Sequence, residues 1–575
     1  MASNTAAQPV STVSSSRLAG PPIVPLIAVI PALAVYGLFI LWPAAWVVIL
    51  SFQQWTGYGP ATFDGLLNYG QLFADPLFQT SLRHSLLWEL GAVLAVVPGL
   101  GIALVLHHSR RPALWLAVLF FPALLPATVV AALWVMLYSP LSGPINSVLA
   151  ALGAGQPDWL GDPHLALPAL FVAWVWATIG IVALVLWTGL RAIGREFLDL
   201  AAVEGAGAWA TFRLVILPAL RRPLAIAVLL EAALGLQVFD LIFVTTGGAP
   251  GYATMILPVD IYGRAFGGQS GQGAAEAVIA LALSLVLVVA ASLLFGRPGP
   301  VTWEETPGRP VGVASIAAAV LAILALLPLL WLLPATAQSS LSFALGQTAY
   351  SLSALGQNFQ AAWTAGAGGA LLTSVLLAGA VVILSLALAF PAAFVLGHAL
   401  PRAARAGILG LLLFGLFQPT MVSIIPLFRL LKDLGLLDSP WGIILPDVAR
   451  ALALGVPVLW IGVAGMAEIL EAAATDGADM LRQALYIALP LARPALALAA
   501  AWAFVTSWND YLLPTVVSQD GSLQTVPTLL GSFIGRYDTQ YGALAAGTIL
   551  GLALPACLWL LATRAQIITS RGSAA

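Results

Sequence analysis

The sequence has little charge for its length. Asp, Glu, Lys and Arg make up only 8% of the 575 residues, whereas a soluble domain carries about 25%. This leaves too little polar surface to cover several water-soluble domains, and 61% of the residues are hydrophobic, with a mean hydropathy of +0.99. The composition therefore excludes a soluble enzyme and a disordered scaffold, and it predicts an integral membrane protein. The net charge of −2 also excludes the basic surface of a nucleic-acid binder.

Cysteine, histidine and lysine are equally scarce. The single cysteine, Cys557, excludes an internal disulfide and a multi-cysteine metal site, and the five histidines form no His-Glu-x-x-His pattern. The only lysine, Lys432, follows Leu431, so the Gly-Lys-Ser/Thr of a phosphate-binding loop is missing. We therefore expect no catalytic residue, no metal and no cofactor on this chain, and no ATP bound by that route.

Long apolar runs are abundant instead. A helix needs roughly 20 mostly apolar residues to span a bilayer, and about twelve segments qualify, six in each half of the chain. The segments of the first half lie near 23–50, 85–106, 113–138, 166–189, 223–245 and 273–295. Those of the second half lie near 313–335, 369–396, 406–427, 441–464, 494–514 and 542–563. The predicted fold class is an all-α integral membrane protein with about 12 transmembrane helices.

Two stretches outside the apolar runs divide the chain. Residues 1–20 are rich in Ser, Ala and Thr and are predicted to be a cytoplasmic tail. Residues 297–312 are rich in Pro, Gly and charge and are predicted to be a cytoplasmic linker between transmembrane domains at 21–296 and 313–575. With both termini in the cytoplasm, sixteen basic residues fall on the inner side and six fall outside. The six are Arg83, Arg264, Arg429, Lys432, Arg450 and Arg536.

One pair of segments repeats at an offset of 272 residues. Asp199-Leu-Ala-Ala-Val-Glu-Gly205 precedes Leu217-Pro218, and Glu471-Ala-Ala-Ala-Thr-Asp-Gly477 precedes Leu489-Pro490. Each copy lies between the fourth and fifth predicted spans of its half, hence on the cytoplasmic side. Because glycine adopts the left-handed conformation that ends a helix, each copy is predicted to be two short helices with a break. In the second copy Met480, Leu481, Ala484 and Leu485 form an apolar stripe suited to a groove on a partner.

These residues resemble the EAA loop of the membrane subunits of binding-protein-dependent ABC importers, whose pattern is Glu-Ala-Ala, Gly, Ile and Leu-Pro. The second copy matches every position, whereas the first has Asp199, Leu200 and Val215 in place of Glu, Ala and Ile. The resemblance implies two tandem six-helix repeats of the importer type, with the two membrane subunits fused in one chain.

In that family the loop is a coupling helix that docks on a cytoplasmic ATPase. The resemblance thus implies a separate ATPase dimer that binds ATP and switches the spans between inward-open and outward-open states. The coupling residues it implies are Asp199, Ala201, Gly205, Leu217, Pro218, Glu471, Ala472, Ala473, Asp476, Gly477, Ile487, Leu489 and Pro490.

Flanking segments resemble the carbohydrate branch of this family. Phe239-Asp-Leu-Ile-Phe-Val-Thr-Thr-Gly-Gly248 is similar to its larger membrane subunit, and Trp508-Asn-Asp-Tyr-Leu-Leu-Pro514 is similar to its smaller one. The implied function is import of a sugar or related polyol, delivered by an extracytoplasmic solute-binding protein, across the cytoplasmic membrane of a bacterium or archaeon. A fused permease for iron(III) or thiamine, and a twelve-span secondary transporter driven by an ion gradient, are the alternatives.

Polar groups inside the predicted spans are candidates for the translocation path, because such groups are costly in lipid. They are Glu231, Gln237, Asp240, Trp508, Asn509 and Asp510. On one continuous helix Gln237 and Asp240 lie about 60° apart and share a face, whereas Glu231 and Asp240 lie about 180° apart. For Asn509 and Asp510, bonding to the local backbone is the alternative. For Trp508 and Phe239, anchoring at the membrane interface is the alternative to stacking on a sugar.

Overall fold

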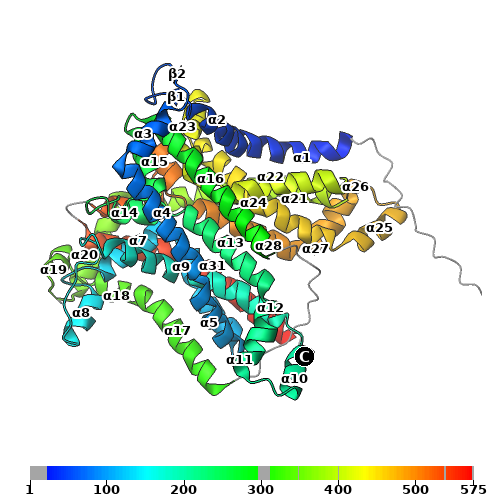
Figure 1. Cartoon of the computed structure of the whole chain (residues 1–575), viewed down its shortest axis with the longest axis horizontal. Coiled ribbons are helices and arrows are strands. Elements are labelled where there is room, and N and C mark those ends of the chain that lie inside the picture. The colour runs from blue at the N-terminus through cyan, green and yellow to red at the C-terminus, as the bar shows by residue number, and fades with distance from the viewer. Residues whose placement is uncertain (1–22, 296–310, 348, 399, 536–538, 573–575) are drawn as a thin grey trace, which may run out of the picture.

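The structure, a computed structural model, is helical throughout its long elements (Figure 1). It describes residues 23–295, 311–347, 349–398, 400–535 and 539–572. Nine helices among these residues are long and apolar enough to cross a membrane, and three bent helix pairs raise the number to as many as twelve. The all-helical membrane fold is confirmed, and about twelve spans is the upper end of this range. The predicted tail 1–20, most of the predicted linker, and Arg536 lie outside the described residues.

The first half contains five long spans and several short elements. The spans are formed by α1 (Ile23–Tyr36) with α2 (Trp42–Leu50), α4 (Pro76–Leu94) with α5 (Val96–His107), α9 (Ala166–Arg191), α13 (Arg221–Leu236) with α14 (Asp240–Thr245), and α16 (Ser270–Phe295). The short elements lie at the end of the molecule that carries the β1–β2 hairpin, which we call the hairpin end. They are β1 (Gln53–Gln54), β2 (Thr62–Phe63), α3 (Leu67–Ala74), α8 (Pro144–Ala151) and α15 (Leu257–Phe266). The two strands pair antiparallel.

The second half follows the same order of long elements, with one exception in its fifth span. The long helices are α17 (Gly312–Leu330) with α18 (Leu332–Thr336), α20 (Leu352–Ala362) with α21 (Gly368–His398), α24 (Trp441–Ala464), α28 (Arg493–Trp508) and α31 (Tyr541–Gly572). The short elements include α19 (Ser340–Ala344), α29 (Leu512–Val517) and α30 (Val526–Phe533). Here α28 stands at 77° to the helical segment Met480–Leu491 before it.

The third predicted span of each half is broken rather than straight. Helix α6 (Pro112–Phe120) with its short 3₁₀ extension stands at 97° to α7 (Ala127–Leu137), and α22 (Arg402–Phe417) stands at 97° to the segment containing α23 (Ile424–Asp433). Proline explains both breaks: Pro126 precedes α7 and Pro419 follows α22, and proline cannot continue a helix that needs its N–H donor. The apolar composition predicted these segments, but not their bends.

The first span of each half packs on the other half. Helix α1 lies against α21 and α24, and α17 lies against α5 and α6. The Tyr36 hydroxyl donates to the Leu411 carbonyl at 2.9 Å and accepts from the Gly415 N–H at 2.9 Å. A Cβ at position 415 would lie 2.3 Å from that hydroxyl, so only glycine fits there. In the reverse direction the Trp176 indole donates to the Ala325 carbonyl at 3.1 Å.

Two asparagines make matching contacts at the hairpin end. The Asn68 amide donates to two carbonyls at 3.0 and 2.9 Å. The Asn358 amide also donates to two carbonyls, at 3.0 and 2.7 Å. The accepting residues are Ser51 and Gln53 in the first case, and Thr336 and Gln338 in the second. In both halves the asparagine thus ties the end of the first span to the helix that follows it.

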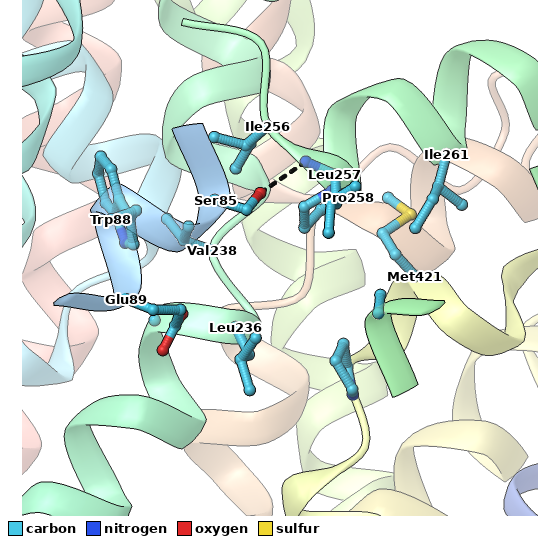
Figure 2. A pocket seen from close by; sticks show the side chains of 13 residues that line it. Ser85, Trp88, Glu89, Leu236, Val238, Ile256, Leu257, Pro258, Ile261 and Met421 are labelled. Atoms are coloured by element: carbon cyan, nitrogen blue, oxygen red, sulfur yellow. Dashed lines mark hydrogen bonds between the residues drawn. The ribbon is translucent and has the colours of Figure 1, made fainter. Parts of the chain in front are cut away.

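Two serines cap corresponding helices. The Ser85 hydroxyl on α4 accepts from the Leu257 N–H at 2.8 Å (Figure 2), and the Ser374 hydroxyl on α21 accepts from the Val526 N–H at 2.9 Å. Leu257 begins α15 and Val526 begins α30, and a proline follows each. Free N–H groups at a helix start need such acceptors when buried.

One charged cluster at the hairpin end joins residues of the first half. Arg264 of α15 forms ion pairs with Asp75 at 2.6 Å, Asp260 at 3.2 Å and Glu276 at 3.1 Å. Burial raises the pKa of Asp75, but the hydrogen bonds from Arg264 and the Leu77 N–H, together with the Arg264 charge, hold that pKa below its usual value. Burial raises the pKa of Asp260 above its usual value, against the influence of Arg264. The cluster ties α4, α15 and α16 together.

Helix α9 crosses α6 at a glycine, and this contact makes a testable prediction. A Cβ at Gly180 would lie 2.1 Å from the Leu119 carbonyl oxygen, which is backbone and cannot move aside cheaply. We expect Gly180→Ala to destabilise the protein by about 1–3 kcal/mol, measured as a lower thermal unfolding midpoint in detergent. The control is Gly379→Ala in α21, where no atom lies within 4 Å of the added carbon. Equal midpoints for the two variants would contradict the contact.

Candidate coupling segments and translocation path

The repeated sequence segments fold as short helices that follow α9 and α24. The first segment contains α10 (Arg195–Val203), α11 (Ala208–Thr211), a π-helical turn (Phe212–Ile216) and α12 (Leu217–Ala219). The second contains α25 (Ala467–Thr475), α26 (Met480–Arg482), a π-helical turn (Gln483–Ala488) and α27 (Leu489–Leu491). We call these the first and second loop segments. Each has a break at the predicted glycine and then resumes as helix.

The break has the same geometry in both loop segments. Gly205 has φ +74° and Gly477 has φ +85°, and neither has an atom within 4 Å of an added Cβ. The N–H of the next residue reaches back over the glycine, from Ala206 to the Ala201 carbonyl at 2.9 Å and from Ala478 to the Ala473 carbonyl at 3.0 Å. This is the hydrogen bond of a helix end with a left-handed residue. Backbone conformation, not space, therefore requires glycine here.

Both loop segments lie at the same end of the bundle. In Figure 1, α25–α27 lie at the right and α10–α12 at the bottom near the middle, whereas α8, α19 and α20 lie at the left edge. Most of the predicted coupling residues are exposed: Asp199, Gly205, Leu217, Pro218, Glu471, Ala472, Asp476, Gly477 and Pro490. Ala473, Ile487 and Leu489 are half-buried, and Ala201 is buried. The geometry leaves these surfaces open to a partner.

Large apolar side chains are exposed beside these residues. In the first loop segment Val203 is 84% exposed and Trp209 71%, and in the second Tyr486 is 78% and Leu481 67% exposed. Of the predicted stripe, Leu481 and Leu485 are exposed, while Met480 and Ala484 are half-buried. Contiguous exposed apolar groups mark interaction surfaces. Trp209 and Tyr486 were not predicted, although two aromatic residues inside a repeated polar loop could have signalled them.

The polar groups of the fifth span do not lie on one helix. Helix α13 ends at Leu236 and α14 begins at Asp240, so the angles expected for a continuous helix were wrong. Gln237 lies in the break, is exposed, and donates to the Leu416 carbonyl of the second half at 3.2 Å. Glu231 is fully buried and accepts from the Thr178 hydroxyl at 3.3 Å.

A small cavity lies one turn beyond Glu231. It has a volume of about 20 Å³ and is lined by residues of α4, α13 and α15, among them Ser85, Glu89, Gly235 and Leu257 (Figure 2). A Cβ at Gly235 would lie 2.7 Å from Glu89 Oε1, so the carboxyl group packs on the glycine. This volume holds about one water molecule and no sugar. The cavity is therefore not itself a solute site in this conformation.

Charged groups of the second half meet close to the break. The Arg450 guanidinium lies 2.7 Å from Asp510 Oδ2 and also bonds Asp447 Oδ1. Asp510 and Asp447 are buried. Asp510 also accepts from the Leu513 N–H at 3.2 Å, which is the local backbone bond named as an alternative. Arg450, counted on the outer side from the sequence, is the tenth residue of α24, where two carboxylates offset its charge.

Trp508 and Asn509 stand at the corresponding break of the second half. Trp508 is only 1% exposed and stacks on Phe504, with ring centroids 5.4 Å apart. Its ring is thus neither at the surface nor free to stack on a solute in this conformation. Asn509 is half-buried and follows the last residue of α28. Phe239 is buried against Phe243, 4.8 Å away.

Comparison with known proteins gives the family. Residues 91–297 match the family described as binding-protein-dependent transport system inner membrane component. A probable ABC transporter permease of Pyrococcus horikoshii is 33% identical over 274 residues, which is 92% of that protein and 46% of this chain. This chain belongs to that family. It is therefore a permease subunit of a binding-protein-dependent ABC importer, a multi-pass inner-membrane protein without a catalytic role.

Other relatives of the permease have names that state a solute. The trehalose/maltose transport permease MalF of Thermococcus litoralis is 30% identical over 92% of its length and 47% of this chain. The diacetylchitobiose uptake permease NgcF of Streptomyces coelicolor is 27% identical over 86% of its length and 50% of this chain. Among solved structures, a bacterial alginate ABC transporter crystallised with its alginate-bound periplasmic protein is 18% identical, with a TM-score of 0.41, over 47% of this chain and 92% of that one.

The buried ion pairs of the permease make a second prediction. We expect Arg450→Met to cost about 3–5 kcal/mol of stability, because it leaves Asp447 and Asp510 buried without their cation. Asp433→Asn should cost less than about 1 kcal/mol, because Asp433 is 67% exposed and lies 3.8 Å from its partner. Thermal unfolding in the same detergent measures both. If the unfolding midpoint of Arg450→Met is no lower than that of Asp433→Asn, the ion pairs of Arg450 do not stabilise the protein.

Proposed function

We propose that this chain is a fused permease, in which two importer-type repeats at 21–296 and 313–575 form the complete membrane pathway for a sugar or related polyol. The support is the order of elements, which recurs in the two halves. Each half has a first span that packs on the other half, a third span bent by 97°, a loop segment and a break in its fifth span. The relatives have the length of one half, since each covers 46–50% of the chain.

The two loop segments are the proposed contacts for a separate cytoplasmic ATPase dimer, which binds ATP. Their matching glycine breaks, their exposed acidic and apolar side chains, and their position at one end of the bundle support this role. A two-fold dimer requires two such contacts on the same side, and repeats related by an axis along the membrane normal supply them. Both termini lie on that cytoplasmic side in this proposal.

The proposed mechanism uses the helix that follows each loop segment. Helix α13 starts at Arg221 directly after α12, and α28 starts at Arg493 directly after α27. Each has 16 residues, and at 1.5 Å per residue this is about 24 Å. Both end at the fifth-span breaks, at 237–239 and 509–511. A displacement of the loop segments when the ATPases close would therefore reach the breaks through two stiff helices and separate the groups there.

The proposed path runs between the halves at these breaks. It includes Glu231, Gln237, Asp240, Trp508, Asn509 and Asp510, and the Gln237 contact with the Leu416 carbonyl supports a path that both halves line. The sugars named for the trehalose/maltose and diacetylchitobiose relatives support the solute class. An extracytoplasmic binding protein is the proposed donor of the solute, at the end of the bundle opposite the loop segments.

Substitutions in the second loop segment test the proposed function. We expect Glu471→Ala and Gly477→Asp to lower co-purification of the host ATPase at least fivefold. The first removes an exposed charge from the proposed docking surface, and the second adds a carboxylate beside Asp476 at an exposed position. Asp199→Ala should have a smaller effect, because the first loop segment already departs from the family pattern. The measurement is the ATPase-to-permease ratio after affinity purification from the native host.

The matched control is Gly477→Asn, because asparagine has the shape of aspartate and tolerates the left-handed conformation as aspartate does, but carries no charge. It should retain most of the ATPase. An unchanged ATPase ratio in both Glu471→Ala and Gly477→Asp would contradict the coupling role. Solute uptake that persists when the ATPase is inactivated would instead support a gradient-driven transporter.

A further inference from the structure

Four charged side chains from both halves meet at the fifth-span breaks. Asp240 begins α14 of the first half, Asp447 and Arg450 belong to α24, and Asp510 follows α28. Arg450 pairs directly with Asp447 and Asp510, and it also interacts electrostatically with Asp240. We call these four residues the Arg450 cluster. The cluster has three carboxyl groups beside one guanidinium. Its net charge is therefore zero when one carboxyl group is ionised and negative when two or three are.

Several hydrogen-bonding atoms of this region have no partner. Asp447 Oδ2, Arg450 Nε and the Asn509 side-chain oxygen are buried and lack a hydrogen bond among the described residues. Asp447 itself is 0% exposed. A buried polar atom without a partner costs about 1–3 kcal/mol, so groups of this kind are normally satisfied by water or a ligand. These three atoms are one donor and two acceptors, and Ser507 Oγ and Trp508 Nε1 of the neighbouring residues also lack a partner.

A row of aromatic rings extends from Tyr511, the residue after Asp510, to the surface. Tyr511 directly follows Asp510, and its ring lies 6.3 Å from that of Phe243. Phe243 contacts Tyr262 at 4.8 Å, and Tyr262 contacts Phe266 at 4.9 Å. Phe266 is 43% exposed, so the row of rings continues to the surface. Aromatic walls with a few convergent polar groups are the usual lining of a site for an organic solute.

We propose that the Arg450 cluster with Asn509 binds a neutral polyhydroxylated solute during transport and rejects anions. A hydroxyl group both donates and accepts, so neighbouring hydroxyls of one solute can satisfy Arg450 Nε, Asp447 Oδ2 and Asn509 together. An ammonium group only donates and would leave Arg450 Nε unmet. An anion only accepts and would face three carboxyl groups. The assignment rests on the proposed function for the statement that solute passes between the halves.

This inference separates two kinds of relative. Permeases named for trehalose/maltose and diacetylchitobiose carry neutral sugars, whereas another relative, 30% identical, is named for the anion sn-glycerol-3-phosphate. The chain is about 30% identical to relatives of both kinds, so sequence identity does not decide whether its solute is neutral or anionic. The charge of the Arg450 cluster places this chain with the neutral solutes.

The test measures which charge can reach Asn509. In a Cys557→Ser background Asn509→Cys provides the only thiol, and the purified full-length chain in nanodiscs is treated with three methanethiosulfonates. Their head groups are neutral glucosyl, cationic trimethylammonium and anionic sulfonate, and each rate is divided by that of the same reagent with free cysteine. We expect the glucosyl reagent to react, the sulfonate to be at least tenfold slower, and the ammonium to be within threefold of the glucosyl reagent.

Charge removal supplies the second readout. Asp510→Asn should raise the relative sulfonate rate at least threefold. If this variant does not fold, Asp240→Asn, at a half-buried position, replaces it and should also raise that rate. The matched control, Asp433→Asn, changes an exposed carboxylate outside the cluster and should leave the ratio unchanged.

Three results would overturn the proposal. They are no reaction with any reagent in a folded protein, a sulfonate rate equal to the glucosyl rate, and an ammonium rate more than tenfold above the glucosyl rate, which would assign the site to a cation. None of them depends on the ATPase. The proposed importer function can therefore hold while this assignment fails, and its own test is the ATPase ratio of the loop-segment variants.

Discussion

The first span of each half packs on the other half, and the rest of the structure depends on this contact. Lipid chains are as apolar as leucine side chains, so helices in a membrane gain little from burying apolar surface and associate through close packing and hydrogen bonds. Tyr36 supplies both, because its hydroxyl sits directly on Gly415 of α22. Trp176 and Ala325 make the reverse contact. Separation of the halves would break both sets at once, so transport motions must occur within one joined body.

Within that body, rigid and interrupted parts alternate in an order that suits a coupled motion. Each loop segment leads into a straight 16-residue helix, and each helix ends at a break where charged groups of the two halves meet. At the hairpin end, by contrast, side-chain bonds join neighbouring elements. These bonds are made by Asn68, Asn358 and the Arg264 cluster. A movement that starts at the loop segments is thus expected to concentrate at the breaks, where the helix of each fifth span is interrupted.

The two halves are alike in connectivity but not in chemistry. The fifth-span break carries Asp240 in one half and Asn509-Asp510 in the other, and the partner cation comes from α24 alone. The members of the buried Arg264 cluster all belong to the first half. Such differences allow one half to provide most of the solute contacts while both halves provide the mechanical link to the ATPase.

Much of the fold could be predicted from composition and spacing. Hydropathy located the long helices to within several residues, because a helix that crosses lipid must be apolar over its whole length. Gly205 and Gly477 predicted the loop-segment breaks, because few other residues adopt a positive φ. The 97° bends were missed, since proline at Pro126 or Pro419 is compatible with a kink, a stop or a loop, and tertiary packing decides among them.

The candidate path was harder to predict than the loop segments. Helical angles placed Gln237 and Asp240 on one face, but the chain breaks between them, and a break without proline leaves little trace in sequence. Arg450 lies inside the predicted span 441–464, but the sequence does not show which residues offset its charge. Its two partners, Asp447 and Asp510, are 3 and 60 residues away, and the second can be recognised only when α24 and α28 are seen side by side.

The central claim is that one chain supplies both contacts of an ATPase dimer, and subunit stoichiometry tests it most directly. Native mass spectrometry of the complex purified from its host in mild detergent should show one copy of this chain with two ATPase subunits. A complex with two copies of this chain and two ATPase subunits would contradict the claim, because each chain would then contribute only one working contact.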